Sequence, residues 1–148
     1  MAVVLVTGAT GFLGRALISK LCERGVDVRA AVRSLMNDLS VPYFLISDIG
    51  PGTNWQEALS GVDIIYHLAG LSEGGNTDAT DDDYDRVNAK GTLALMTAAA
   101  EANVKRVIIT STIKVLGELS EAGPFDEKSQ PHPQTAYAQS KLLAEQHA

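Results

Sequence analysis

The chain has 148 residues and a formal net charge of −6, and 45% of its residues are hydrophobic and 20% charged. Enough apolar residues are present to build one compact domain, which excludes a disordered chain, and the acidic balance disfavours general nucleic-acid binding because it repels phosphate. No apolar run approaches the roughly 20 residues of a membrane span, the start lacks the basic lead of a signal peptide, and Cys22, the only cysteine, cannot form an internal disulfide, so the sequence predicts a soluble cytoplasmic protein.

Short apolar runs alternate with longer amphipathic stretches along the chain. The apolar runs predict five strands, over residues 3–6, 26–32, 43–46, 62–68 and 106–110. The amphipathic stretches predict helices over residues 12–24, 55–59, 81–103 and 135–147. Gly25 ends the first helix, and the acidic run 81–83 suits the positive end of the dipole of the long helix.

This alternation predicts an α/β fold with a parallel sheet covered by helices on both faces. Right-handed crossovers then give a doubly wound sheet with the strand order 3-2-1-4-5. Two irregular segments, 70–80 and 111–134, follow the carboxyl ends of strands, where ligands bind in such sheets. We therefore expect both segments to border the functional site.

A glycine-rich turn, Thr7-Gly8-Ala9-Thr10-Gly11-Phe12-Leu13-Gly14, joins the first strand to the first helix. Gly8 permits a tight turn, Gly11 lets the backbone approach a pyrophosphate, and Gly14 lets the helix lie close to the sheet. Free N–H groups at the helix start then face the phosphates. The turn predicts a dinucleotide site, and the alternative is a tight turn that binds no ligand.

The turn resembles the short-chain dehydrogenase/reductase superfamily, and TGATGFLG is similar to the motif of its extended branch. Further matches run through nearly all of the chain. They are Asp48-Ile49, His67-Leu68-Ala69-Gly70, Val87-Asn88-Ala89-Lys90-Gly91-Thr92, the loop from Ser111 to Glu118, and Tyr137-Ala138-Gln139-Ser140-Lys141. Within the extended branch, the set is most similar to nucleotide-sugar epimerases and dehydratases.

The resemblance implies a Rossmann-type domain that binds NAD(P), with Asp48 and Ile49 against the adenine. The residues expected to hold the cofactor are Gly8, Gly11, Phe12, Leu13, Gly14, Arg33, Asp48, Ile49, Leu68, Ala69, Gly70, Asn88, Tyr137 and Lys141. Asn88 has two interpretations, since it either borders the cofactor or only adjusts the backbone bonding of the long helix.

The end of the second strand bears on the choice between NAD and NADP. A carboxylate there would bond the ribose 2′-OH, and a cationic side chain would accept a 2′-phosphate. Val32 occupies the position expected to carry the acid, and Arg33 follows it. Because a guanidinium can fork onto phosphate oxygens, Arg33 favours NADP. The alternatives are that Arg33 is a solvated loop residue and that the cofactor is NAD, which sugar epimerases of this branch mostly use.

Three residues form the predicted catalytic set, namely Thr112, Tyr137 and Lys141. Tyr137 and Lys141 are four apart on a predicted helix and share a face, so the ammonium can lower the pKa of the phenol. The phenol then exchanges a proton with a substrate hydroxyl or a forming alkoxide. Thr112 falls at the family's Ser/Thr position and would orient the substrate, with Ser111 as a substitute.

Other polar residues suggest less specific chemistry. His67 ends a strand, where a structural role is favoured over catalysis, and the acidic run 81–83 is a solvated helix start or, alternatively, a cation site. His132 and His147 are isolated and suggest no metal site.

The resemblance implies that residues 1–148 form a cofactor-binding domain, and we expect the substrate domain of the extended branch to be absent. The sequence therefore leaves several functions open. They are an NAD(P)-dependent epimerase or dehydratase acting on a nucleotide sugar, or a fragment of one; an NADPH-dependent carbonyl reductase; and a dinucleotide-binding module without turnover. The fifth strand would be an open edge, so we expect this edge or the two long helices to be covered in a homo-oligomer.

Overall fold

Five parallel strands form a sheet in the order β3-β2-β1-β4-β5 in the computed structural model, which describes residues 2–74, 78–120 and 123–148. The strands are β1 (Val3–Thr7), β2 (Asp27–Val32), β3 (Tyr43–Leu45), β4 (Ile64–His67) and β5 (Arg106–Ile109). The predicted doubly wound α/β fold and its strand order are confirmed. The register aligns Thr7 with Ala31 and His67, and His67 with Ile109, so the carboxyl ends of four strands meet at one edge.

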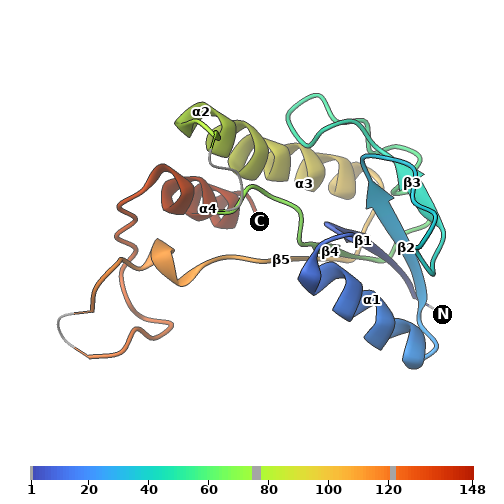
Figure 1. Ribbon diagram of the computed structural model, residues 1–148, viewed down its shortest axis with the longest axis horizontal. Coiled ribbons are helices and arrows are strands. Elements are labelled where there is room, and N and C mark those ends of the chain that lie inside the picture. The colour runs from blue at the N-terminus through green and yellow to red at the C-terminus, as the bar shows by residue number, and fades with distance from the viewer. Residues whose placement is uncertain (1, 75–77, 121–122) are drawn as a thin grey trace.

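The side chains of β1 alternate between two hydrophobic cores. Leu5 packs in one core with Trp55 and Leu95, whereas Val4 and Val6 pack in the other. Helix α1 (Phe12–Glu23) covers the second core, and α3 (Gly91–Glu101) lies across the opposite face of the sheet (Figure 1). The two-sided burial explains why the central strands read as continuous apolar runs rather than alternating ones.

The predicted long helix over residues 81–103 consists of three consecutive elements: α2 (Asp81–Tyr84), a π-helical segment η1 (Asp85–Lys90), and α3. Thr80 and Asp83 start it with a capping box, because each accepts the backbone N–H of the other. Asn103, in the left-handed region at φ 57°, ends it. The acidic run therefore supplies a helix cap through Asp83.

The last helix, α4 (Ala136–His147), begins at Thr135, whose side chain accepts the N–H of Ala138. It lies beside α2 and η1 on the same side of the sheet as α3 (Figure 1). None of the described helices is long and apolar enough to cross a membrane.

One local prediction is wrong. Residues 55–59, predicted as a short helix, form a series of hydrogen-bonded turns that ends at Gly61 with φ 69°. A segment of this length gains too few hydrogen bonds to stabilise a helix, and it is held instead by burial of Trp55 and Leu59. The segment 111–134, predicted as irregular, is so over its described residues apart from one 3-10 turn, η2 (Ile113–Val115).

Candidate functional site

Close backbone packing shapes the turn between β1 and α1. Gly8 has φ +66°, and a Cβ atom there would lie 2.7 Å from the backbone nitrogen of Ala69. A Cβ atom at Gly14 would lie 2.1 Å from the carbonyl oxygen of Gly8. The two glycines therefore let the start of α1 and the end of β4 approach the same turn. Gly8 and Gly11 add no side chain to the cavity face of this turn, whereas Ala9 and Thr10 do.

The amino end of α1 faces the carboxyl edge of the sheet without side-chain caps. Gly11 is the N-cap, no side chain of a described residue caps it, and the first turn contains no acidic residue. Phe12 is 95% exposed and Leu13 is 52% exposed in the first turn of the helix. An uncapped helix start of this kind attracts anions.

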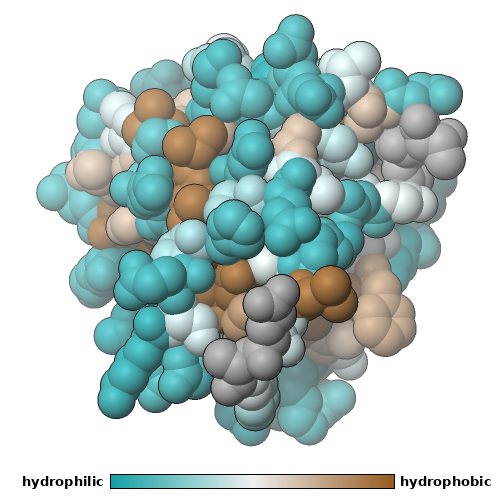
Figure 2. Space-filling view, turned by 90° about the vertical axis from the view of Figure 1, so that its left-hand side faces the viewer, coloured by the Kyte–Doolittle hydropathy of each residue, from teal (hydrophilic) through white to brown (hydrophobic). Residues whose placement is uncertain are grey.

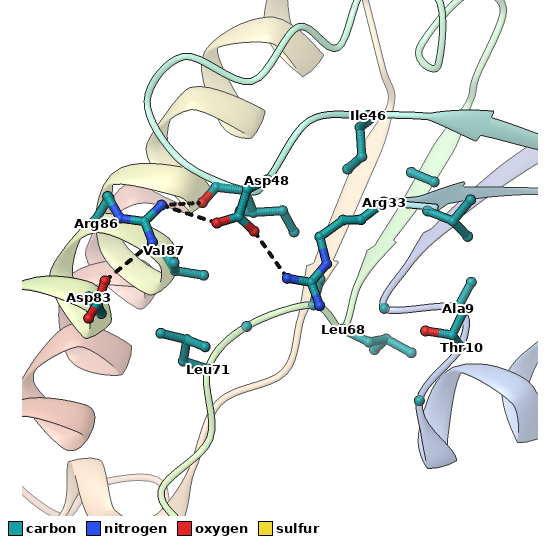
Figure 3. A pocket seen from close by; sticks show the side chains of 17 residues that line it. Ala9, Thr10, Arg33, Ile46, Asp48, Leu68, Leu71, Asp83, Arg86 and Val87 are labelled. Carbon is teal, nitrogen blue, oxygen red and sulfur yellow. Dashed lines mark hydrogen bonds and ion pairs between the residues drawn. The ribbon is translucent and has the colours of Figure 1, made fainter. Parts of the chain in front are cut away.

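A cavity of about 400 Å³ opens between this turn and the ends of β2, β3 and β4 (Figure 3). Eight of the predicted cofactor residues line it: Gly8, Gly11, Arg33, Asp48, Ile49, Leu68, Ala69 and Gly70. Six do not: Phe12, Leu13, Gly14, Asn88, Tyr137 and Lys141. Asp83 and Arg86 also line the cavity. The sequence assigned neither residue a role at the site, because nothing in the neighbouring sequence of a charged helix residue reveals a partner far away in the chain.

Asp48 is held between two arginines at the mouth of the cavity (Figure 3). Its Oδ1 lies 3.1 Å from Arg33 Nη1, and its Oδ2 lies 3.3 Å from Arg86 Nη1. Partial burial acts to raise the pKa of the Asp48 carboxyl, but its hydrogen bonds to Arg33 and Arg86 outweigh this and leave the pKa below its ordinary value. Arg33 is thus paired with Asp48 in this structure, and its side chain remains 70% exposed, so both sequence interpretations of this residue stay open.

His67 is buried at the end of β4. Its Nδ1 lies within hydrogen-bond distance of Thr7 Oγ1, at 2.7 Å, and Thr7 Oγ1 accepts the backbone N–H of Ala69 at 3.2 Å. Burial, with a smaller effect from the charge of Lys141, lowers the pKa of His67 to about 4. The imidazole is therefore neutral at physiological pH and supports the strand end that borders the cavity.

Asn88 joins three segments through its side chain. Its Oδ1 accepts the N–H of Leu71 at 2.8 Å, and its Nδ2 donates to Leu71 O at 3.0 Å and to Ser140 Oγ at 3.1 Å. A Cβ atom at Gly70 would lie 2.8 Å from Asn88 Oδ1. The side chain thus ties the loop after β4 to α4, and neither of the two sequence interpretations described this link.

Tyr137 and Lys141 lie on α4, as the spacing predicted. The Tyr137 ring packs against that of Tyr84 with centroids 5.8 Å apart and an interplanar angle of 61°. Burial lowers the pKa of Lys141, and the nearby Glu145 opposes this effect. The charge of Lys141 also contributes to the lowered pKa of His67 at the end of β4.

Thr112 lies in a second cavity, of about 790 Å³, whose described lining residues do not include Tyr137 or Lys141. Its Oγ1 accepts the N–H of Lys114 at 3.4 Å and so caps η2. Ser111 Oγ donates to Glu145 on α4. The structure thus brings both hydroxyl residues to the end of β5 beside α4, with Ser111 engaged by that helix.

Among the described residues, no group of three or more His, Cys, Asp or Glu side chains could hold a metal ion.

The chain is similar in sequence and in fold to several known proteins. Residues 4–148 match the model of the NAD dependent epimerase/dehydratase family. The chain is 34% identical to a 4-hydroxy-2-methyl-3-oxo-4-farnesyl-3,4-dihydroquinoline-1-oxide ketoreductase of Stigmatella aurantiaca, with 95% of this chain and 43% of that protein covered. It is 32% identical to a UDP-glucose 4-epimerase of Vibrio cholerae, with 96% and 44% covered.

Among solved structures, MoeE5 in complex with UDP-glucose and NAD superposes with a TM-score of 0.84 at 32% identity. That alignment covers 97% of this chain and 47% of MoeE5. The chain therefore spans less than half the length of these three proteins.

Proposed function

This chain belongs to the NAD dependent epimerase/dehydratase family, and we propose that it is the dinucleotide-binding part of an enzyme that moves a hydride from and back to a nucleotide sugar. The observation that carries the proposal is the cavity at the carboxyl ends of β1 to β4, which eight of the predicted cofactor residues line. Ligands of doubly wound sheets bind at this edge.

The residues present fit a dinucleotide diphosphate. Gly11 offers no side chain and α1 offers uncapped N–H groups, so an anion can approach the backbone closely. Ile49 and Val87 supply apolar surface on one side of the cavity, and Asp48 supplies a carboxylate next to it. This division into a polar backbone end and a mixed apolar end suits a diphosphate joined to an adenosine.

The nicotinamide, when bound, supplies a hydride acceptor and donor. Tyr137 would take the proton of a substrate hydroxyl at its Oη and return it in the reverse step. Lys141, as a neighbouring cation on the same helix face, would favour the phenolate form of Tyr137. Thr112 would orient the substrate through its hydroxyl.

A second candidate reaction is carbonyl reduction with NADPH. The observation that favours it is the pair Val32 and Arg33 at the end of β2, where a cation rather than a carboxylate faces the cavity. We propose that Arg33 selects NADP by accepting a 2′-phosphate. The ketoreductase relative from Stigmatella aurantiaca is compatible with this reaction class.

We further propose that the chain self-associates through its long helices. Leu93 on α3 and Leu143 on α4 are 44% and 38% exposed. Figure 2, which looks onto the side of the molecule that carries α4 and the segment after β5, shows hydrophobic residues among the hydrophilic ones. A second copy could cover such residues. Light scattering at high concentration tests this, and a monomeric mass would contradict it.

Fluorescence titration with NADH and NADPH tests the proposed cofactor site directly. The wild-type chain should bind at least one of them, and Gly11→Ala should weaken binding at least tenfold, about the cost of 1.4 kcal/mol, because the added methyl group stands where the diphosphate approaches. Gly52→Ala is the control for an added methyl group, since a Cβ atom there meets no described atom within 4 Å, whereas one at Gly11 would lie 3.3 Å from Gly8 O. Equal affinities for wild type and Gly11→Ala would refute the site.

Turnover tests the catalytic assignment. If the chain, or a longer protein that contains it, converts a nucleotide sugar or reduces a carbonyl, Tyr137→Phe should lower the rate by about a hundredfold or more. Dinucleotide affinity in Tyr137→Phe should stay within a few-fold of the wild-type value, which separates loss of proton transfer from loss of binding.

A further inference from the structure

Asp48 is shared by two arginines that are anchored very differently. Arg33 is 70% exposed, and within the described chain it bonds to no side chain other than Asp48. An exposed single ion pair is worth little, because water and salt screen it. Arg33 can therefore leave Asp48 at small cost when a stronger anion enters the cavity.

Arg86 is anchored on the helix side of the cavity (Figure 3). Its Nη1 donates to Asp48 Oδ2 at 3.3 Å and to Ile49 O at 3.5 Å, and its Nη2 donates to Asp83 Oδ1 at 3.3 Å. The other oxygen of Asp83 accepts the N–H of Thr80 at 3.1 Å in the capping box. Arg86 is 45% exposed, less than Arg33, and among the described residues it has three acceptors, one of them in a helix cap, where Arg33 has one.

We propose that Arg86 is a positioning residue that keeps Asp48 paired when Arg33 turns to a phosphate monoester on the adenosine ribose, and so sets the preference between phosphorylated and unphosphorylated dinucleotides. The inference rests on the proposed function, because it concerns the same cavity. Without a second cation, the transfer of Arg33 would leave the Asp48 carboxylate unpaired beside the incoming dianion, and like charges repel.

Two alternatives predict different results. If Arg86 only tethers the segment around Ile49 to η1, its loss weakens every dinucleotide alike. If Arg86 compensates the charge of Asp48, its loss weakens ligands that carry the 2′-phosphate more than those that lack it. The ratio of the NADPH and NADH dissociation constants isolates this difference, because adenine and diphosphate contacts are common to both ligands.

The experiment measures both dissociation constants by fluorescence titration at low ionic strength. Arg86→Gln should raise the ratio of the NADPH to the NADH constant about fivefold, the upper range for exposed ion pairs. Arg86→Lys should recover part of the effect, since it keeps the charge. Asp48→Asn added to Arg86→Gln should restore the ratio to near the wild-type value, because it removes the carboxylate that retains Arg33 and repels phosphate.

An unchanged ratio in Arg86→Gln would overturn the inference, and so would a loss that is equal for both ligands and is not reversed by Asp48→Asn. If the wild-type chain binds NADH and its affinity for NADPH is no higher, this inference is wrong but the proposed dinucleotide site is not contradicted. Absence of binding of either ligand would overturn the proposed function as well. Circular dichroism of each variant establishes that it is folded, and Arg86→Lys provides a test where Arg86→Gln is unfolded.

Discussion

Gly14 and Gly8 approach so closely that a Cβ atom at Gly14 would lie 2.1 Å from the carbonyl oxygen of Gly8. The same atom would lie 2.8 Å from the Cα of Ala9. Both neighbours are backbone atoms, so no side chain can rotate away to relieve the clash. Gly14 therefore acts through packing of α1 against β1, and its position outside the described lining of the cavity agrees with this role.

We predict that Gly14→Ala lowers the free energy of unfolding by about 3 kcal/mol, because α1 must shift away from the turn to admit a methyl group. Helix propensity alone would make the alanine variant more stable by about 1 kcal/mol. The sign of the change in unfolding free energy therefore distinguishes a packing effect from a propensity effect. Urea unfolding followed by circular dichroism measures the change. Gly52→Ala should stay within about 0.5 kcal/mol of wild type. Wild-type stability in Gly14→Ala would contradict the role of this contact as a packing constraint on α1.

Asn88 provides a second stability test. Asn88→Ala removes three hydrogen bonds and leaves the N–H of Leu71 without its side-chain acceptor, so we expect a loss of about 3 kcal/mol. Ser140→Ala removes one of the three bonds and also the bond that Ser140 Oγ donates to the carbonyl oxygen of Tyr137 at 2.7 Å, so it should cost about 2 kcal/mol. Urea unfolding of both variants and of the double variant gives the coupling energy. Fully additive effects would show that Asn88 and Ser140 do not act as a pair.

The sheet could be predicted from the sequence because its signals are local. Apolar runs end at glycines and polar turns, and the strand order follows from right-handed crossovers. The π-helical segment was not predictable, since the periodicity of residues 81–103 fits an α-helix equally well. For residues 55–59 the sequence predicted a helix that the structure does not contain. Burial of Trp55, and not helix formation, determines the local structure there.

The part of the candidate site that depends on close backbone packing was predictable, because such packing requires glycines at fixed spacing. The ion pairs between residues far apart in the sequence were not. Arg33 and Asp48 are 15 residues apart, and Arg86 and Asp48 are 38 apart. No periodicity links such positions, so the pairing of Asp48 with two arginines required coordinates. The contact of Asn88 with Ser140, 52 residues away, was hidden for the same reason.

Stability should depend on pH through His67. Its pKa is about 4 in the folded chain, lowered by burial first and by the charge of Lys141 second, against an ordinary value of 6.5. Between these two pH values the unfolded chain binds more protons, so the stabilisation is complete above pH 6.5 and is lost as the pH falls toward about 4. The full effect is about 3 kcal/mol.

Urea unfolding at several pH values between about 7.5 and 4.5 measures this dependence. His67→Asn keeps an acceptor near Thr7 Oγ1 but does not titrate, so its stability should fall less steeply below pH 6.5. Carboxylates titrate in both proteins, and their contribution cancels in the difference. Identical slopes for wild type and His67→Asn would exclude His67 as the source.

Lys141 should influence the titration of His67 in the folded chain. The charge of the amine disfavours a second positive charge nearby, so Lys141→Gln should raise the pKa of His67 above its wild-type value of about 4. Because burial is the larger cause, the pKa in the variant should remain below 6.5. Imidazole resonances followed by NMR during acid titration measure the shift.

Lys20→Gln, which removes an exposed cation from α1 on the other side of the sheet, is the matched control and should leave the pKa of His67 unchanged. Equal pKa values in wild type and Lys141→Gln would show that the charge of Lys141 does not contribute to the lowered pKa of His67.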